Sequence, residues 1–266
     1  MNRNLVRKTV NDRWPGALMY LIGIEAYVLL SAALYPTVKN MKGLDEIIKK
    51  TPKSVFKLFG MSSTDFTSFN NYMVGRLLGL LWVIVVAAFV IAFARAMVAG
   101  EREEGTLELL LAQPIERWNV LTSEGLVLLA GIIGLVVATV LGTVAFGAAF
   151  GAHITFAGYF AFVPAASALF IAIAGYSIFF SAIMRDARRV AMAAAGLTLA
   201  FYMIHFAASY SSVADKVDWF GIFHYYDPLK VLNSGNVPVK SFLILLAFGA
   251  IGFCAALLVF RHKDIN

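Results

Sequence analysis

The sequence predicts an all-α polytopic membrane protein with six transmembrane helices, organised as a single transmembrane domain over residues 1–266. Hydrophobic residues make up 60% of the chain and charged residues only 14%, a ratio that excludes an ordinary soluble domain. Six apolar segments are each long enough to cross a bilayer: residues 17–35, 77–98, 126–146, 159–183, 190–208 and 242–260. The net charge of +6 does not indicate nucleic-acid binding, because the basic residues are scattered and form no stripe.

The chain begins with a basic stretch, residues 1–14, in which apolar residues alternate with arginine and lysine. This pattern predicts a short interfacial helix that lies on the inner leaflet of the membrane. Trp14 and Pro15 mark the expected entry into the bilayer.

One formal charge lies near the middle of an apolar segment. Glu25 is in the first span, where a carboxylate costs about 2.5–3.5 kcal/mol to place at mid-bilayer. It is tolerated if it faces a polar cavity, finds a partner or is protonated. Two roles stay open for Glu25: contact with a substrate on the translocation pathway, or a structural hydrogen bond to a neighbouring helix.

Two long polar segments, residues 36–76 and 209–240, are expected on the side of the membrane away from the termini. In the first, Leu44, Ile47 and Ile48 share one face, which predicts amphipathic helices on the membrane surface. In the second, aromatic residues cluster just before Asp227-Pro228: Trp219, Phe220, Phe223, Tyr225 and Tyr226. Such a cluster indicates an element at the level of the lipid headgroups.

The densest run of charge falls between the second and third spans, in residues 99–124. Thr106 is a good N-cap, and Glu108 falls in the first turn of the helix that it would begin. Leu107, Leu110 and Leu111 share one face of this short helix, and Pro114 ends it. From the residues alone, a docking surface for another protein and a solvated loop with a structural helix are equally supported.

Small residues mark the fifth span as a packing surface. Ala191, Ala194 and Ala195 are followed by Gly196, which favours close contact with another helix.

Several kinds of chemistry have no support in the sequence. No glycine is followed by lysine, so the chain contains no ordinary phosphate-binding loop and ATP hydrolysis would need a separate polypeptide. The four histidines are scattered without ligand spacing, so neither a metal site nor catalytic residues are expected. A packing role is expected for His205, the one histidine inside an apolar segment.

The stretch Glu101-Arg-Glu-Glu-Gly-Thr-Leu-Glu-Leu-Leu-Leu-Ala-Gln-Pro114 resembles the E-x-x-x-G-T-x-E-x-L-L-x-x-P signature of ABC transporter permeases of the type-2 exporter class. The resemblance implies that this loop holds a coupling helix resting on a cytoplasmic ABC ATPase subunit, which binds ATP and magnesium; this chain would carry no cofactor. The residues implied in coupling are Glu101, Arg102, Glu104, Gly105, Thr106, Glu108, Leu110, Leu111 and Pro114.

The same resemblance implies two permeases, identical or homologous, working with two ATPase subunits. The first and fifth helices of such permeases pack near the dimer axis, which gives Ala191, Ala194 and Ala195 an expected role in dimer packing. The substrate would move outward across the plasma membrane and would be a drug, a peptide antibiotic, a lipid or an ion. Six spans place both termini on one side, and the basic N-terminus and the basic turn at residues 185–189 make that side cytoplasmic.

Two other functions stay open from the sequence. In an ion-coupled secondary transporter, Glu25 would be the proton or cation site, although the chain shows no internal repeat. In a membrane sensor or scaffold, the acidic loop would dock a soluble partner without transport.

Overall fold

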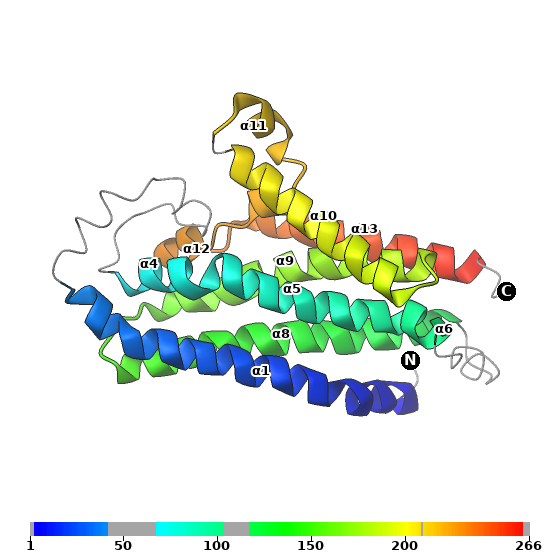
Figure 1. The fold of residues 1–266 in the computed structure, drawn as a ribbon, viewed down its shortest axis with the longest axis horizontal. Coiled ribbons are helices and arrows are strands. Elements are labelled where there is room, and N and C mark those ends of the chain that lie inside the picture. The colour runs from blue at the N-terminus through cyan, green and yellow to red at the C-terminus, as the bar shows by residue number, and fades with distance from the viewer. Residues whose placement is uncertain (1–2, 42–67, 104–116, 209, 263–266) are drawn as a thin grey trace.

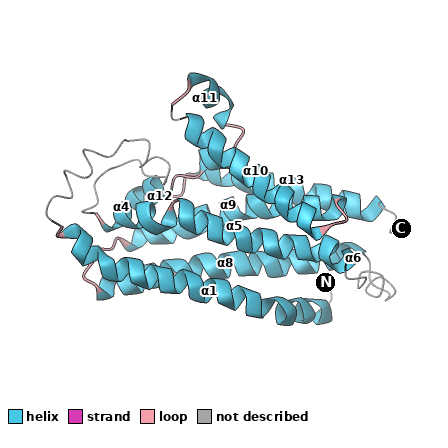
Figure 2. Cartoon of the chain, viewed as in Figure 1, coloured by secondary structure: helices cyan, strands magenta, loops and turns pink. Residues whose placement is uncertain are grey.

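The computed structural model describes residues 3–41, 68–103, 117–208 and 210–262. Every regular element in these ranges is helical (Figure 2). Six of the described helices are long and apolar enough to cross a membrane, which confirms the predicted number of spans. They are α1 (Arg3–Lys39), α5 (Leu80–Arg95) with the helical turns that continue it to Glu103, α8 (Arg117–Ala149), α9 (Phe156–Ile183), α10 (Ala187–Ala208) and α13 (Val239–His262).

Shorter helices flank these spans. The π-helices η1 (Val74–Leu78) and η2 (Ala96–Gly100) lie at the two ends of α5. A π-turn inserts one extra residue into the helical ladder, and such turns are found disproportionately at functional sites. The other short elements are α4 (Phe69–Met73), α6 (Glu101–Glu103), α11 (Ser212–Asp218), the 3₁₀-helix η3 (Ile222–Tyr225) and α12 (Pro228–Ser234).

The long helices run side by side along the molecule (Figure 1). Both ends of the chain lie at the end that holds α6, whereas α4 and α12 lie at the opposite end (Figure 1). α9 is the central helix, because 78% of the residues in its most apolar stretch are buried, compared with 22% for α1 and 17% for α13. α10 leads away from this bundle to α11, which projects from its side (Figure 1).

Glycines bring α9 and α13 into backbone contact. A Cβ atom added at Gly252 would lie 2.5 Å from the carbonyl carbon of Gly175, and one added at Gly175 would collide with the carbonyl oxygen of Gly249. Only glycine fits at these positions, as is common where membrane helices approach closely. The pair of helices therefore behaves as one unit in the centre of the fold.

An indole ring joins three of the long helices. Trp82 of α5 is buried, and its Nε1 donates a hydrogen bond to Thr139 Oγ1 of α8 at 3.1 Å. The same ring packs against Phe162 and Phe170 of α9, with centroids 5.6 and 5.1 Å away. A buried indole needs such a partner for its N–H group, so Thr139 fixes the orientation of Trp82.

The N-terminal part of the chain differs from its prediction. Residues 1–14 were expected to form a separate interfacial helix, but α1 runs without a break from Arg3 to Lys39 and contains both Pro15 and Pro36. The expectation of a separate helix is wrong because a proline within a long helix of a membrane protein can be accommodated by local adjustment and neighbouring groups. Leu5 is buried against Val120 of α8, so α8 covers one face of this part of α1.

The segment before the last span contains short helices, and its place at the level of the lipid headgroups stays a prediction. Asp227 Oδ1 accepts a hydrogen bond from Lys230 N at 3.0 Å and caps α12, with Pro228 in the first turn. Gly235 ends α12 in the left-handed conformation at φ 65°. The amphipathic face around Leu44 lies outside the described residues.

Candidate functional site

The coupling residues predicted from the sequence are only partly described. Glu101 and Arg102 lie in α6, with the Glu101 side chain 14% exposed and Arg102 beside Arg185. The other predicted residues fall outside the described ranges: Glu104, Gly105, Thr106, Glu108, Leu110, Leu111 and Pro114. The helix capped by Thr106 therefore stays a prediction, and the structure gives the two ends from which this segment leaves the bundle, α6 and the start of α8.

The segment from Ala96 to Glu103, formed by η2 and α6 and called here the inner segment, is held first by α1. Arg13 Nη2 donates a hydrogen bond to the carbonyl oxygen of Ala96 at 3.1 Å. The same guanidinium lies 5.7 Å from the centroid of the Phe93 ring, a cation–π distance. One turn further on, Lys8 Nζ lies 4.0 Å from Glu101 Oε1. α1 thus contacts both halves of the inner segment.

A buried serine of α9 makes the second attachment. Ser181 Oγ accepts hydrogen bonds from the backbone amides of Val98 at 3.3 Å and Ala99 at 3.2 Å. Both amides belong to the π-turn η2, and the Ser181 side chain is fully buried. The hydroxyl therefore satisfies main-chain donors at the point where the helical ladder carries an extra residue.

α10 makes the third attachment. Glu103 Oε2 accepts a hydrogen bond at 3.3 Å from the amide of Ala187, the first residue of α10. A carboxylate at a helix N-terminus is stabilised by the helix dipole and by the free amides there. Asp186 acts in the same way, since its Oδ1 accepts from Arg188 N at 2.8 Å. A movement of α6 would therefore displace the first residue of α10 through the hydrogen bond between Glu103 and Ala187.

A carboxylate that sequence reasoning did not single out completes this region. Glu124 is 5% exposed, and its Oε2 has no hydrogen-bond partner among the described residues. The charged groups that interact with it are Glu101, Arg13 and Lys8. The third span was expected to begin at residue 126, but α8 begins at Arg117, so Glu124 lies two turns inside a helix. Leu121, Glu124 and Leu128 follow one another at helical spacing of three and four residues, and all three are buried. That spacing is a sequence signal that could have placed Glu124 on the buried face of a helix.

Glu25 does not lie in this region. It is half-buried between α1 and α8, where a Cβ atom added at Gly142 would overlap Glu25 Oε2. Its Oε1 is buried and has no hydrogen-bond partner in the described ranges. A nearby cavity of about 330 Å³ between α1 and α5 is lined by Ile24 and Tyr27 but not by Glu25. A role on the substrate pathway therefore stays a prediction.

The small-residue face of α10 is divided between two environments. Ala194 is fully buried within the chain, so its side chain packs against this chain itself, and its expected role in dimer packing stays a prediction. Its place on the helix faces α9 and α5, on which α10 packs. Ala191 is half-buried against the core, and Ala195 is exposed beside Met192 and Leu199. Of the three alanines, Ala195 alone is exposed.

Two histidines that are distant in sequence meet at the end of α10. The buried carboxylate of Asp218 lies 3.1 Å from His205 Nδ1 and 2.7 Å from His224 Nδ1, and it accepts a hydrogen bond from each ring whose Nδ1 carries a hydrogen. His205 thus makes a structural contact, as expected, but one that joins α10, α11 and η3. Separations of 13 and 6 residues gave no sequence signal for this cluster.

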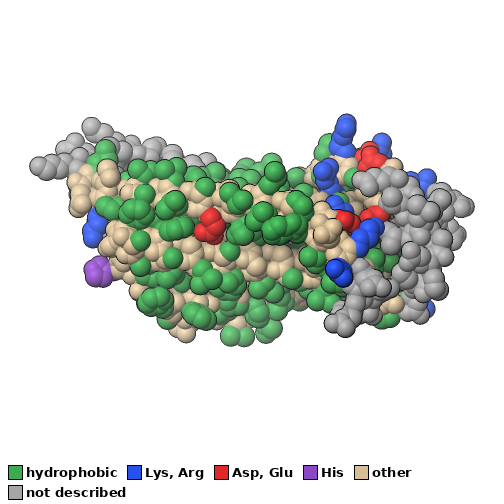
Figure 3. Space-filling view, turned by 90° about the horizontal axis from the view of Figure 1, so that it is seen from below, with side chains coloured by type: hydrophobic (Ala, Val, Ile, Leu, Met, Phe, Trp, Pro, Cys, Tyr) green, Lys and Arg blue, Asp and Glu red, His purple; other side chains and the backbone are tan. Residues whose placement is uncertain are grey.

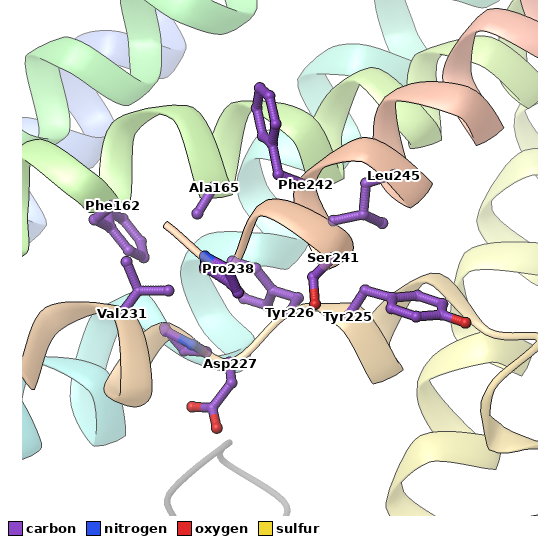
Figure 4. A pocket seen from close by; sticks show the side chains of 11 residues that line it. Phe162, Ala165, Tyr225, Tyr226, Asp227, Val231, Pro238, Ser241, Phe242 and Leu245 are labelled. Atoms are coloured by element: carbon purple, nitrogen blue, oxygen red, sulfur yellow. The ribbon is translucent and has the colours of Figure 1, made fainter. Parts of the chain in front are cut away.

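A small crevice lies where α12 meets α13 (Figure 4). Tyr226 lines it and donates a hydrogen bond to the carbonyl oxygen of Leu78 at 3.3 Å. Burial, together with the adjacent Asp227 carboxylate, raises the pKa of Tyr226. The crevice has room for about 10 Å³, no more than one water molecule, so it does not suit a substrate.

Hydrophobic side chains cover the middle of the molecule, and most of the charged side chains on this face gather at the α6 end (Figure 3). With six apolar helices in the described ranges, this distribution defines a multi-pass α-helical membrane protein. A family model described as ABC-2 family transporter protein matches residues 15–265, so the chain belongs to the ABC-2 family of transporter permeases. Such a permease is a membrane transport subunit that works with an ABC ATPase subunit. A search of curated proteins found no match.

Proposed function

We propose that this chain is the membrane-spanning permease subunit of an ATP-driven exporter that moves its substrate outward. The observation that carries the proposal is the set of contacts around the inner segment, whose last three residues, Glu101 to Glu103, begin the permease signature. Through Arg13, Ser181 and Glu103 this segment is bound to α1, α9 and α10. A push on residues 104–116 by an ATPase would therefore reach three membrane helices at once.

The proposed assembly contains two permeases, identical or homologous, and two cytoplasmic ATPase subunits that bind ATP and magnesium. The α6 end faces the cytoplasm of a cell whose plasma membrane holds the complex. Basic side chains at or next to the helix ends here support that orientation: Arg102, Arg185, Arg188, Arg189 and Arg261. The described positions of Met192, Ala195 and Leu199 leave an exposed apolar strip on α10 for the second permease.

The substrate class is a drug, a peptide antibiotic, a lipid or an ion. An apolar groove of about 540 Å³ between α8, α9 and α13 favours the hydrophobic members of this group, since Thr122 is its one polar lining residue. That volume is within the usual range for ligand sites of roughly 300–1,000 Å³.

The test is reconstitution. The permease is purified with the ATPase that accompanies it and placed in proteoliposomes with the ATPase outside, and candidate substrates are screened for stimulated ATP hydrolysis and for uptake into the vesicle lumen. ATP-dependent uptake supports the proposal, and an ATPase variant lacking the lysine of its phosphate-binding loop is the control. Uptake driven by an ion gradient without ATP would instead support the ion-coupled transporter centred on Glu25, and stable ATPase docking with no transport of any compound would support a sensor.

A further inference from the structure

The π-turn η2 is the last regular structure before α6 and the signature-bearing residues. In an α-helix each residue turns the chain by about 100° and advances it by about 1.5 Å. If the extra residue of a π-turn is absorbed or moved, everything that follows it rotates and shifts by about that amount. The form of η2 therefore sets the direction in which α6 leaves the membrane helices.

Side chains from outside the helix hold η2 in its π form. The hydroxyl of Ser181 accepts from two successive amides, Val98 N and Ala99 N, and Arg13 Nη2 donates to Ala96 O. The hydroxyl contact is dry, because Ser181 and Ala99 are both fully buried. Ala99 also packs with Ala187 and Val190 of α10, so the attachment point lies among three helices.

The serine one turn earlier on α9 shows that this contact is specific. Ser177 is equally buried, but its Oγ donates to the carbonyl oxygen of Ile173 within its own helix at 2.7 Å. Of these two serines, Ser181 alone links α9 to the inner segment. From α9 the chain passes within a few residues to Ala187, which Glu103 binds, so η2 and α6 are attached at both sides of the α9–α10 turn.

We propose that Ser181 is a positioning residue for energy coupling: by holding η2 in its π form, it sets the angle at which residues 104–116 meet the ATPase. This inference rests on the proposed function. Ser181 contacts neither the substrate nor the ATPase in this scheme and acts through the backbone of Val98 and Ala99.

The first measurement needs no ATPase. Hydrogen–deuterium exchange of the purified permease in lipid nanodiscs is followed on peptides covering residues 96–103. Ser181→Ala should speed exchange at Val98 and Ala99, because their acceptor is lost, whereas Ser177→Ala should leave these amides unchanged. Equal exchange in both variants would overturn the attachment itself.

The second measurement is substrate transported per ATP hydrolysed in proteoliposomes containing the ATPase. Ser181→Ala should lower this ratio by about five-fold or more, the low end of the usual range for coupling between two sites. Ser177→Ala should keep the wild-type ratio, and Ser181→Thr, which retains the hydroxyl, should restore it. An unchanged ratio in Ser181→Ala despite faster exchange refutes positioning but leaves the exporter proposal intact.

Equal loss in the alanine and threonine variants would assign the effect to packing and would also overturn the role of the hydroxyl. A wild-type complex that hydrolyses ATP but transports none of the screened compounds would overturn the exporter proposal and the coupling role with it. The exchange result would then still report separately on the bond between Ser181 and η2.

Discussion

Replacing Gly142 with alanine should force Glu25 out of its place between α1 and α8. The added Cβ atom would overlap Glu25 Oε2 and lie 2.8 Å from the carboxyl carbon and 3.1 Å from Oε1. Something must move, and overpacking of this kind costs about 1–3 kcal/mol. Glu25 Oε1 is already buried without a hydrogen-bond partner among the described residues, so no existing hydrogen bond would guide the displaced carboxylate to a new position.

Gly134→Ala in the same helix is the matched control, because a Cβ atom there would meet nothing within 4 Å. Both substitutions gain the helix propensity of alanine over glycine, about 1 kcal/mol, so this gain cancels when the two variants are compared. The difference between them is then the overlap alone, about 1–3 kcal/mol, or roughly 2–12 °C in melting temperature at about 2–4 °C per kcal/mol. Thermal unfolding in lipid nanodiscs, followed by tryptophan fluorescence, measures it.

A double variant isolates the contact. In a Glu25→Ala background, Gly142→Ala should be no worse than Gly134→Ala, because the carboxylate that it displaces is gone; contacting residues typically couple by about 0.5–3 kcal/mol. Equal melting temperatures for the two glycine variants in the wild-type background would refute the contact. A penalty that persists without Glu25 would assign it to another neighbour of Gly142.

Three further predictions concern other parts of the molecule. Glu108→Lys should insert normally but abolish transport, because it opposes the dipole of the predicted coupling helix by about 0.3–1 kcal/mol and reverses the charge offered to the ATPase; full transport at normal expression contradicts this. Asp218→Asn should lower the free energy of unfolding by about 1.5–3 kcal/mol, the range for hydrogen bonds to a charged group, and speed exchange over residues 210–226, which mass spectrometry can follow. Ala195→Leu should weaken association of two permeases in cross-linking assays, whereas Ala194→Leu should instead lower thermal stability; the reverse pattern would place the dimer surface on the buried face of α10.

The spans could be predicted from the sequence because their apolar runs are long and continuous, and α9, α10 and α13 begin within three residues of expectation. The extent of α1 could not, since Pro15 and the basic residues before it look like a boundary when the helices that cover Leu5 are unknown. The start of α8 was missed for the same reason: its first two turns, which hold Glu124, were assigned to the loop before the third span because the packing around them was unknown.

The attachments of the inner segment depend on tertiary structure and left little trace in the sequence. Ser181 and Ala99 are separated by 82 residues, and the sequence around Ala96–Gly100 contains no pattern that predicts a π-turn. Ala194 shows the converse problem. Its small side chain indicates close packing correctly, but composition alone does not say whether the partner is α9 of the same chain or a helix of a second one.

The unequal lengths of the spanning helices have a consequence for how much of each helix lies in the bilayer. α1 has 37 residues and α13 has 24, which correspond to about 55 and about 36 Å of helix. To fit the thickness that α13 needs, α1 would have to tilt by about 49°, beyond the usual range of roughly 0–40°. α1 therefore extends past the hydrocarbon layer, and α4 and α12 lie at the same end of the molecule as its C-terminal end (Figure 1). In a membrane that matches α13, part of α1 would therefore lie among lipid headgroups or in water rather than among acyl chains.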